Sequence, residues 1–232
     1  MFLCLTLIVS RGAIADFEEI VVTASKSEKT IGETAGSISI IDETDLSRIS
    51  HVHINELLQR VPGVWISRGN GQEHLTAVRS PVLTGAGSCG AFLIAQDGIS
   101  LRAPGFCNVN QLFESTSEIA ERVEVFRGPN SSIYGSNAVH GVINIITPEP
   151  GTEKKELYLE RGPDDFYKAK LTLSTENFRM DFSGSHDGGY KENSGYGQQK
   201  LLLKHKKNSG SFSIKTTLSL TNLNQETAGF IM

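Results

Sequence analysis

The chain has 232 residues, 38% of them hydrophobic, and a formal net charge of −4 at pH 7. This length is enough for one or two domains with a buried core. The 22 lysines and arginines are spread along the chain without forming a basic stripe, which argues against nucleic acid as a partner. No stretch of about 18 apolar residues follows the N-terminal region, so a helical membrane protein is excluded as well.

The first fifteen residues have features of a secretory signal peptide. An apolar run over residues 2–9 precedes Ala13-Ile14-Ala15, which has the small-x-small pattern of a signal-peptidase site. No clear basic segment stands before the run, which leaves open a start further upstream. We expect export with cleavage before Asp16; the alternative is an apolar N-terminal strand.

Two cysteines, Cys89 and Cys107, remain after the predicted cleavage. In an exported chain an even pair favours a disulfide over a metal site. The bond would close a loop of about 20 residues and contribute about 3 kcal/mol by chain entropy. The alternative is two unlinked buried thiols.

A short β-prone run follows the predicted leader at residues 16–25, and polar residues follow it at 25–29. Such an isolated strand is suited to pairing with the open sheet edge of a partner. The alternative is a first strand that pairs within its own chain.

Residues 36–150 have the pattern of a small α/β domain. Residues 37–41 alternate as a strand, and Asp42 is a suitable N-cap for a following helix. The spacing i, i+3, i+4, i+7 of four apolar residues predicts an amphipathic helix that ends at Pro62-Gly63. These residues are Ile54, Leu57, Leu58 and Val61. Further strands are expected at residues 63–66, 76–79, 91–95 and 123–126, with glycine-rich turns between them.

From residue 151 the pattern changes to apolar and polar residues in strict alternation. Strands of a membrane barrel show this pattern, and so do strands of a soluble β-sandwich. The connections at 176–177 and 207–210 are tight, whereas 187–195 is longer, and this difference between two rims favours the barrel. The predicted outward apolar residues are Leu157, Leu159, Tyr167, Ala169, Leu171, Leu173, Phe178, Met180, Phe182, Phe212, Ile214, Leu218 and Leu220.

Two further motifs suggest chemistry that their surroundings do not support. Residues 85–90 have GxGxxG spacing, but a strand is expected after them instead of the helix that a dinucleotide site needs. His51 and His53 could ligate a metal, but no further ligand set stands near them, and a polar helix entrance explains them better. Nor do we find a nucleophile and base that would indicate an enzyme.

Residues 119–147 resemble the plug signature of TonB-dependent receptors. They contain Arg127-Gly128-Pro129 and Tyr134-Gly135, and they end in an Asn-Ile-Ile-Thr run at 144–147. The early plug helix of the family resembles residues 57–64, and its central Asp-Gly strand end resembles Gln96-Asp97-Gly98-Ile99. The fold implied is an α+β plug domain, a small mixed sheet with short helices, followed by the first antiparallel strands of an incomplete transmembrane β-barrel.

The resemblance also implies roles for particular residues. Arg79 and Arg127 match plug arginines that pair with carboxylates on the barrel wall and so lock the plug inside the barrel. An energy-transducing partner, TonB, would pair with the Ton box and pull on it. No cofactor and no catalysed reaction are implied. The Ton box resembles Glu18, Glu19, Ile20, Val21, Val22, Thr23 and Ala24.

We expect ligand contacts near the end of the loop between the two cysteines, which carries aromatic, amide and guanidinium groups. The candidates are Arg102, Phe106, Asn108 and Asn110. The alternative is a structural loop without ligand contact.

The resulting hypothesis is an outer-membrane receptor of a Gram-negative bacterium that takes up a ferric siderophore, haem or cobalamin-like nutrient. Its Ton box and linker would occupy residues 16–35, its plug residues 36–150 and its barrel strands, in contact with lipid, residues 151–232. Transporters of this kind close about 22 strands, whereas this segment holds about five, so we expect further barrel sequence beyond it. The alternative function is a soluble ligand-binding or signalling module.

Overall fold

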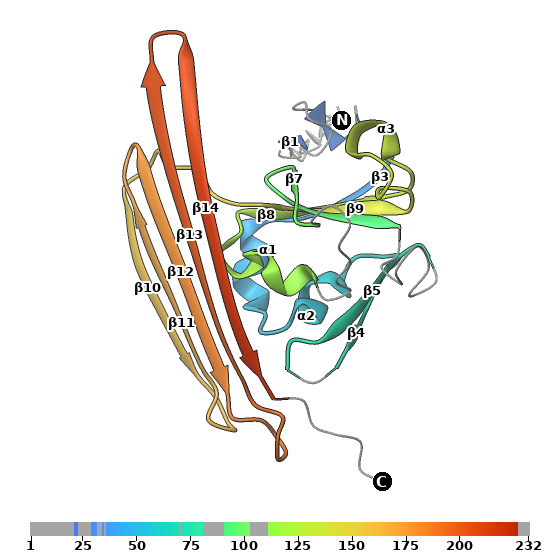
Figure 1. The fold of residues 1–232 in the computed structure, drawn as a ribbon, viewed down its shortest axis with the longest axis vertical. Helices are drawn as coiled ribbons and strands as arrows, with labels where there is room; N and C mark the ends of the chain where they lie inside the picture. Colours follow the sequence, from blue (N-terminus) through green and yellow to red (C-terminus); the bar gives the residue numbers. More distant parts are fainter. Residues whose placement is uncertain are drawn as a thin grey trace, which may run out of the picture.

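A computed structural model describes residues 21–22, 29–31, 34, 36–69, 71–80, 91–102 and 111–226. Figure 1 shows two parts: a compact N-terminal domain, and a tall curved sheet of five strands that stands along one side of it. Near the upper end of Figure 1, the two-residue strands β1 (Val21–Val22) and β2 (Lys29–Thr30) pair antiparallel.

A five-stranded mixed sheet forms the centre of the N-terminal domain, with strand order β3-β8-β9-β6-β7. Only the β6 and β9 pair is parallel, and the other neighbours are antiparallel. Asp97 and Gly98 connect β6 to β7 with positive φ angles of 51° and 75°, as a two-residue hairpin turn requires. The strands are β3 (Ser37–Ile41), β6 (Phe92–Gln96), β7 (Ile99–Ser100), β8 (Arg122–Arg127) and β9 (Gly141–Ile146).

Short helices and a separate hairpin complete the domain. The Asp42 carboxylate accepts a 2.8 Å hydrogen bond from the amide of Asp45, which confirms the predicted N-cap of the first helix. Among the helices that the structure describes, none has both the length and the apolar character needed to span a bilayer. The helices are α1 (Glu43–Ile49), α2 (Ile54–Leu58), α3 (Ser131–Tyr134) and the 3₁₀ turns η3 (Gln111–Glu114) and η4 (Ser117–Ile119); the hairpin strands are β4 (Val64–Arg68) and β5 (His74–Val78).

The main core lies between α1, α2 and one face of the mixed sheet. Leu57 and Leu58 are fully buried, and Ile54 and Val61 lie in the same cluster, so the predicted apolar face of this helix is confirmed. Val123, Val125, Ile143 and Ile145 enter the cluster from the sheet. Burial of each such side chain contributes about 1.5 to 3 kcal/mol.

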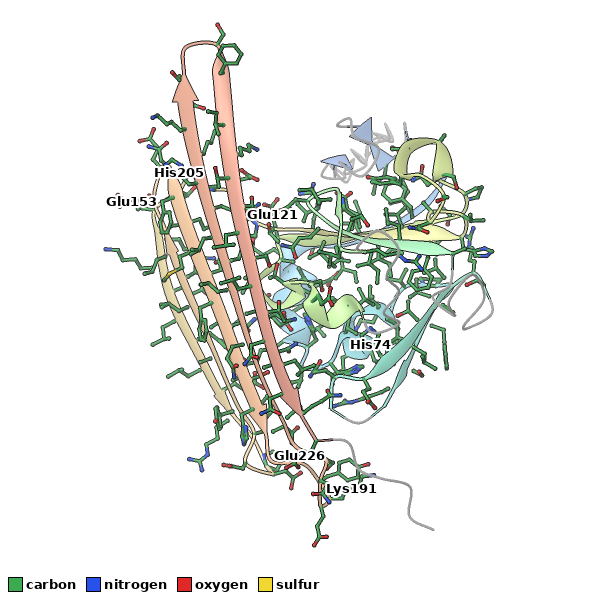
Figure 2. All side chains as sticks on the ribbon, viewed as in Figure 1. His74, Glu121, Glu153, Lys191, His205 and Glu226 are labelled. Atoms are coloured by element: carbon green, nitrogen blue, oxygen red, sulfur yellow. The ribbon has the colours of Figure 1, made fainter. Side chains whose placement is uncertain are left out.

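The curved sheet is an antiparallel meander in the order β10-β11-β12-β13-β14. The tight connections at 175–177 and 210–211 lie at one end, and the longer ones at 162–166 and 188–195 lie at the other, as predicted. Figure 2 shows Lys191 and Glu226 at the lower end, with His205 and Glu153 towards the upper end. The strands are β10 (Lys154–Arg161), β11 (Tyr167–Ser174), β12 (Phe178–Asp187), β13 (Tyr196–Ser209) and β14 (Phe212–Gln225).

The outer face of the curved sheet, which points away from the N-terminal domain, is apolar. One row of directly paired residues crosses all five strands, and it consists of Leu157, Leu171, Phe182, Leu201 and Leu220. Leu159 is 70% exposed and Phe212 is 76% exposed on this face. The predicted alternation is therefore confirmed, with every second residue turned outwards.

Two of the longer strands, β9 and β13, were not predicted from the sequence. In β13 the run Leu201-Leu202-Leu203 hides the alternation, because Leu202 is the one that points inwards and is fully buried. In β9 all but the last residue are buried, so this central strand has no polar face to alternate.

Candidate functional site

The inner face of the curved sheet carries four lysines that point at the N-terminal domain. They lie on β11 and β13, at alternate positions to the outward apolar residues. Three of them are nearly completely buried, which is unusual for lysine and requires hydrogen-bond partners. The four are Lys168, Lys170, Lys200 and Lys204.

Lys200 and Glu118 form the central ion pair of this contact. The Lys200 Nζ atom lies 2.7 Å and 2.9 Å from the two carboxylate oxygens of Glu118, and it donates a 2.6 Å bond to the carbonyl of Ser115. Both side chains are at least nine-tenths buried. Burial alone would raise the pKa of Glu118, but the charge of Lys200, with help from neighbouring groups, outweighs burial and lowers the pKa below its usual range. The carboxylate is therefore ionised at neutral pH.

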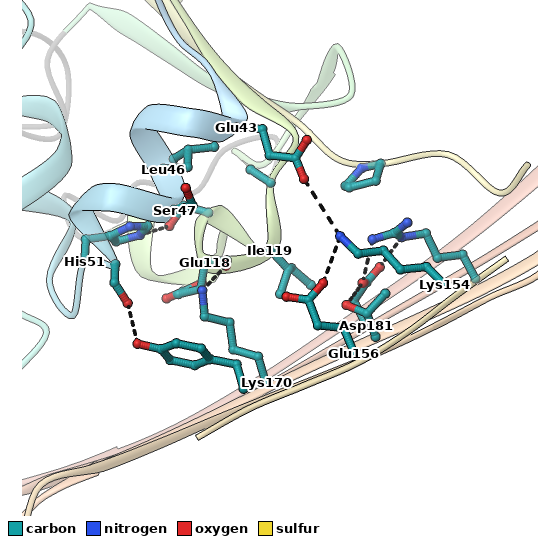
Figure 3. Close-up of a pocket in the computed structure, with 17 residues that line it drawn as sticks. Glu43, Leu46, Ser47, His51, Glu118, Ile119, Lys154, Glu156, Lys170 and Asp181 are labelled. Carbon is teal, nitrogen blue, oxygen red and sulfur yellow. Dashed lines mark hydrogen bonds and ion pairs between the residues drawn. The ribbon is translucent and has the colours of Figure 1, made fainter. Parts of the chain in front are cut away.

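Lys168 and Lys170 donate to backbone carbonyls where helical segments of the N-terminal domain end. The Lys168 Nζ atom donates to the carbonyls of Ser50 (3.1 Å) and His51 (2.7 Å), just after α1. Lys170 donates to the carbonyl of Glu118 at 3.1 Å, and Figure 3 shows it reaching from the curved sheet towards η4. A cation stabilises the free carbonyls at the C-terminal end of a helix.

Lys204 joins the curved sheet to the segment between the two parts. Its Nζ atom donates to the carbonyl of Thr147 at 3.0 Å, and it lies 3.1 Å from the carboxylates of both Asp97 and Glu149. Asp97 in turn accepts from the amide and hydroxyl of Thr147, at 2.8 Å and 2.6 Å. Lys215 also pairs with Glu149 at 3.1 Å. The end of β9, the β6–β7 turn and strands β13 and β14 are thus held together at one point.

A polar cavity of about 170 Å³ lies between α1, η4 and strands β10 to β12 (Figure 3). Its charged groups are largely neutralised by one another, as in the Arg179 and Asp181 pair at 2.7 Å and the Lys154 and Glu156 pair at 2.9 Å. Among the described residues, no group of three His, Cys, Asp or Glu side chains is placed to hold a metal ion. The cavity has the chemistry of a hydrated contact between two parts of the protein.

Two histidines near the start of α2 are buried, and His51 also lines this cavity. The ring of His51 makes a 3.0 Å hydrogen bond with the Ser117 hydroxyl, and His53 caps α2 by accepting from the amide of Asn55. Burial lowers the pKa of His51 to about 3 and that of His53 to about 4. Both are therefore neutral at pH 7, and they occupy the helix entrance as predicted.

These two histidines make the stability of the N-terminal domain depend on pH. Since their folded pKa values lie below the ordinary 6.5, the unfolded chain binds protons first as the pH falls. We expect stability to be constant above pH 6.5 and to fall by up to about 1.4 kcal/mol per histidine for each pH unit below it. Urea midpoints of the protein in detergent at pH 7.5 and pH 5 measure the change.

The variant His51→Gln should lose part of this pH dependence, whereas His205→Gln, on the exposed outer face, should keep all of it. Equal urea midpoints at both pH values in the unchanged protein would contradict the assignment.

Arg79 and Arg127 lie side by side, as the Arg79 guanidinium donates a 3.2 Å bond to the carbonyl of Arg127. Among the described residues, the acceptors of the two side chains are neutral oxygens of the N-terminal domain. Their pairing with carboxylates of a barrel wall stays a prediction.

The other predicted site residues lie mostly outside the described residues. Only Val21 and Val22 of the Ton box are described, and both cysteines, Phe106, Asn108 and Asn110 are not. Arg102 follows β7, where its amide donates a 3.1 Å bond to the Ser100 hydroxyl. The disulfide and the ligand contacts therefore stay predictions.

The geometry thus combines a mixed-sheet domain with a curved sheet that buried lysines fasten to it and that is apolar on its far side. Residues 30–142 match the TonB-dependent Receptor Plug Domain family. The chain therefore carries a TonB-dependent receptor plug domain, and the antiparallel strands β10 to β14 follow it as an open sheet.

Solved structures share this fold. The pyoverdine outer membrane receptor FpvA from Pseudomonas aeruginosa PAO1, bound to pyoverdine, has a TM-score of 0.67 and 19% identity, with 90% of this chain and 31% of that chain covered. The siderophore receptor PiuA from Acinetobacter baumannii has a TM-score of 0.63 and 19% identity, with coverages of 88% and 28%. The FpvAI chain of a complex with pyocin S2 has a TM-score of 0.62 and 21% identity, with coverages of 80% and 25%. The chain thus spans between a quarter and a third of these three chains.

The contacts of the four lysines on the inner face of the curved sheet, here called the wall lysines, were not predicted from the sequence. The alternation of apolar and polar residues shows only that these positions are polar. It does not distinguish a lysine exposed to water from a lysine that is hydrogen-bonded to the plug. The available signal was the repetition of lysine at 168 and 170 and at 200 and 204, at positions that alternate with the outward-facing leucines.

Proposed function

We propose that this chain forms the plug and first barrel strands of a receptor for energy-coupled uptake across the outer membrane of a Gram-negative bacterium. The cargo class is a ferric siderophore, haem or a cobalamin-like nutrient. One observation carries the proposal: Lys200 and its neighbours fix the plug against a curved sheet whose opposite face is exposed and apolar. This arrangement places a globular domain on the inside of a wall that is suited to lipid on the outside.

The apolar face favours lipid as the surroundings of this wall over a soluble sandwich. A sandwich buries its apolar face against a second sheet, at a spacing of about 10 Å. Here the described residues place no second sheet on that side, and Leu157, Leu159 and Phe212 are at least 65% exposed there. Exposed apolar area of this extent on a water-soluble protein would be an association surface.

Energy coupling would act through the Ton box, residues 18–24. In the proposed mechanism TonB pairs with this segment as an added strand, and the receptor itself catalyses no reaction. The plug must then yield to a pull at its N-terminal end while its far side stays attached. Lysine contacts at Ser50, Ser115 and Thr147 support attachment on the side of the curved sheet.

The ligand would bind at the end of the molecule where the longer connections lie. There a groove of about 430 Å³ lies between the β4–β5 connection and the connection at 188–195, and Arg68, Tyr190 and Tyr196 line it. A guanidinium beside aromatic rings suits an anionic or planar ligand. The predicted loop residues Arg102, Phe106, Asn108 and Asn110 are proposed as further contacts.

Removal of the Ton box tests the coupling. We expect deletion of residues 18–24 from the full-length gene to abolish nutrient-dependent growth while cells still bind the ligand, because binding does not require the pull. The point variant Val21→Pro should act alike, since proline removes an amide donor from the added strand. Val21→Thr is the matched control and should keep uptake.

Growth on iron supplied as ferric siderophore or haem, or on limiting cobalamin, identifies the cargo. Growth of the deletion strain equal to that of the parent on every source would refute energy-coupled transport.

A further inference from the structure

Arg79 and Arg127 form a compact cluster around Gly63. The amide of Arg79 donates a 2.8 Å bond to the carbonyl of Gly63. A Cβ atom at Gly63 would lie 3.3 Å from Arg79 Cγ and 3.6 Å from Arg127 Cδ, so both side chains pack directly on this glycine. Arg79 itself has a φ angle of 47°, a backbone conformation that residues other than glycine rarely adopt. The local backbone thus fixes where the two guanidiniums lie.

Among the described residues, the two guanidiniums donate five hydrogen bonds, and three of these end on the first three residues of β3. Arg79 Nη2 donates to the Ser37 hydroxyl at 3.1 Å, and Arg127 Nη2 donates to the Ser39 hydroxyl at 2.9 Å and the Ile38 carbonyl at 3.3 Å. The remaining two end on carbonyls, of Arg127 and Pro62. The cluster is therefore mainly a contact with β3.

β3 is the edge strand of the mixed sheet, and β8 is its only partner strand among the described residues. Its five residues alternate: Ile38 and Ile40 pack on the small core of Leu93, Phe126 and their neighbours, while the serines face the arginines. β3 is also the first strand of the mixed sheet in chain order, so tension on the N-terminal segment reaches Ser37 before the rest of that sheet.

The two guanidiniums are close together and have no counter-charge nearby. Among the described residues, neither forms an ion pair with a carboxylate. Burial and the charge of Arg79 lower the pKa of Arg127. Serine hydroxyls and carbonyls accept from the terminal nitrogens without neutralising the charge, whereas the buried Arg127 Nε atom has no hydrogen-bond partner among the described residues. The contact is therefore held by hydrogen bonds alone.

We propose that Ser37 and Ser39 are positioning residues that fasten β3 to Arg79 and Arg127, so that β3 leaves the plug sheet only after the two guanidiniums release its oxygens. The coupling role of this release rests on the proposed function. The fastening itself does not, because it exists in the resting protein.

Hydrogen exchange in β3 tests the fastening. The full-length receptor in outer-membrane vesicles is compared with the double variant Ser37→Ala with Ser39→Ala. Because two hydrogen bonds to charged groups are lost, we expect the amides of residues 38–41 to exchange at least about tenfold faster. Exchange in β9 should stay unchanged, since the core of the sheet is not touched.

Two matched variants separate the hydroxyls from other effects. Ser37→Thr with Ser39→Thr keeps both hydroxyls and should restore the exchange rates of the unchanged receptor. Ser47→Ala removes a serine hydroxyl that bonds only within α1, to the carbonyl of Thr44, and should leave β3 unaffected. If the double alanine variant does not assemble, Ser39→Ala alone provides the same comparison.

The outcomes distinguish this inference from transport. Unchanged β3 exchange in the alanine variants overturns the fastening, whatever uptake does. Equal acceleration in the alanine and threonine variants overturns it as well. Faster exchange in the alanine variants only supports it, and this holds even if deletion of residues 18–24 leaves uptake intact and so removes the transport proposal.

Discussion

Replacement of Lys200 by methionine is expected to weaken the contact between the plug and the curved sheet more than the replacement of any other side chain on the inner face of that sheet. The variant leaves the buried Glu118 carboxyl group without its partner, and it also removes the donor to the Ser115 carbonyl. Breaking one side of a buried pair costs about 3 to 5 kcal/mol. We expect a correspondingly lower urea concentration for loss of hydrogen-exchange protection at residues 115–119 in the full-length receptor in detergent.

Two further variants test whether the loss comes from the unpaired charge. Lys207→Met changes an exposed lysine of the same strand and should leave the urea midpoint unchanged. Combining Lys200→Met with Glu118→Gln removes both charges and should restore part of the loss, because no ion is then left unpaired. A Lys200→Met receptor that matches Lys207→Met in its midpoint would show that the ion pair does not hold the plug.

Gly141→Ala is expected to prevent the plug from folding. Gly141 begins β9 in the middle of the mixed sheet, between Phe92 of β6 and Arg127 of β8. A Cβ atom there would lie 2.4 Å from the Phe126 carbonyl oxygen and 2.7 Å from Val78 Cγ1. The backbone oxygen cannot move without breaking the sheet, so we expect a loss of about 3 kcal/mol or more.

The amount of protease-resistant plug in outer membranes measures this loss. Gly197→Ala is the matched control: Gly197 is also a strand glycine, but the nearest atom to its Cβ would be 3.8 Å away. Resistance of the Gly141→Ala plug equal to that of the Gly197→Ala plug would contradict the packing argument.

Local patterns predicted the secondary structure where each element has one polar and one buried face. The spacing of Ile54, Leu57, Leu58 and Val61 gave the α2 region, and Asp42 gave the start of α1, because both signals lie within a few residues. β13 was not predicted because its run of three leucines hides the alternation, and β9 was not predicted either, although the equally buried β6 was. The plug signature itself was recognised from residues 119–147.

The functional contacts were harder to predict, because they join residues far apart in sequence. Lys200 meets Glu118 across 82 positions, and Lys168 meets Ser50 across 118. Arg79 and Arg127 were singled out by resemblance, but their contact with Ser37 and Ser39 required the strand order β3-β8-β9. No local pattern indicates which serine of a strand faces a guanidinium.

The wall lysines bond chiefly to main-chain oxygens of the plug, at Ser50, His51, Ser115, Glu118 and Thr147. Every residue type supplies the same oxygen, so substitution at Ser50, Ser115 or Thr147 leaves this acceptor in place. Substitution at these three positions should therefore leave the main-chain hydrogen bonds in place, whereas a displacement of the backbone would break them. Tolerance to mutation and sensitivity to movement are thus properties of one and the same contact.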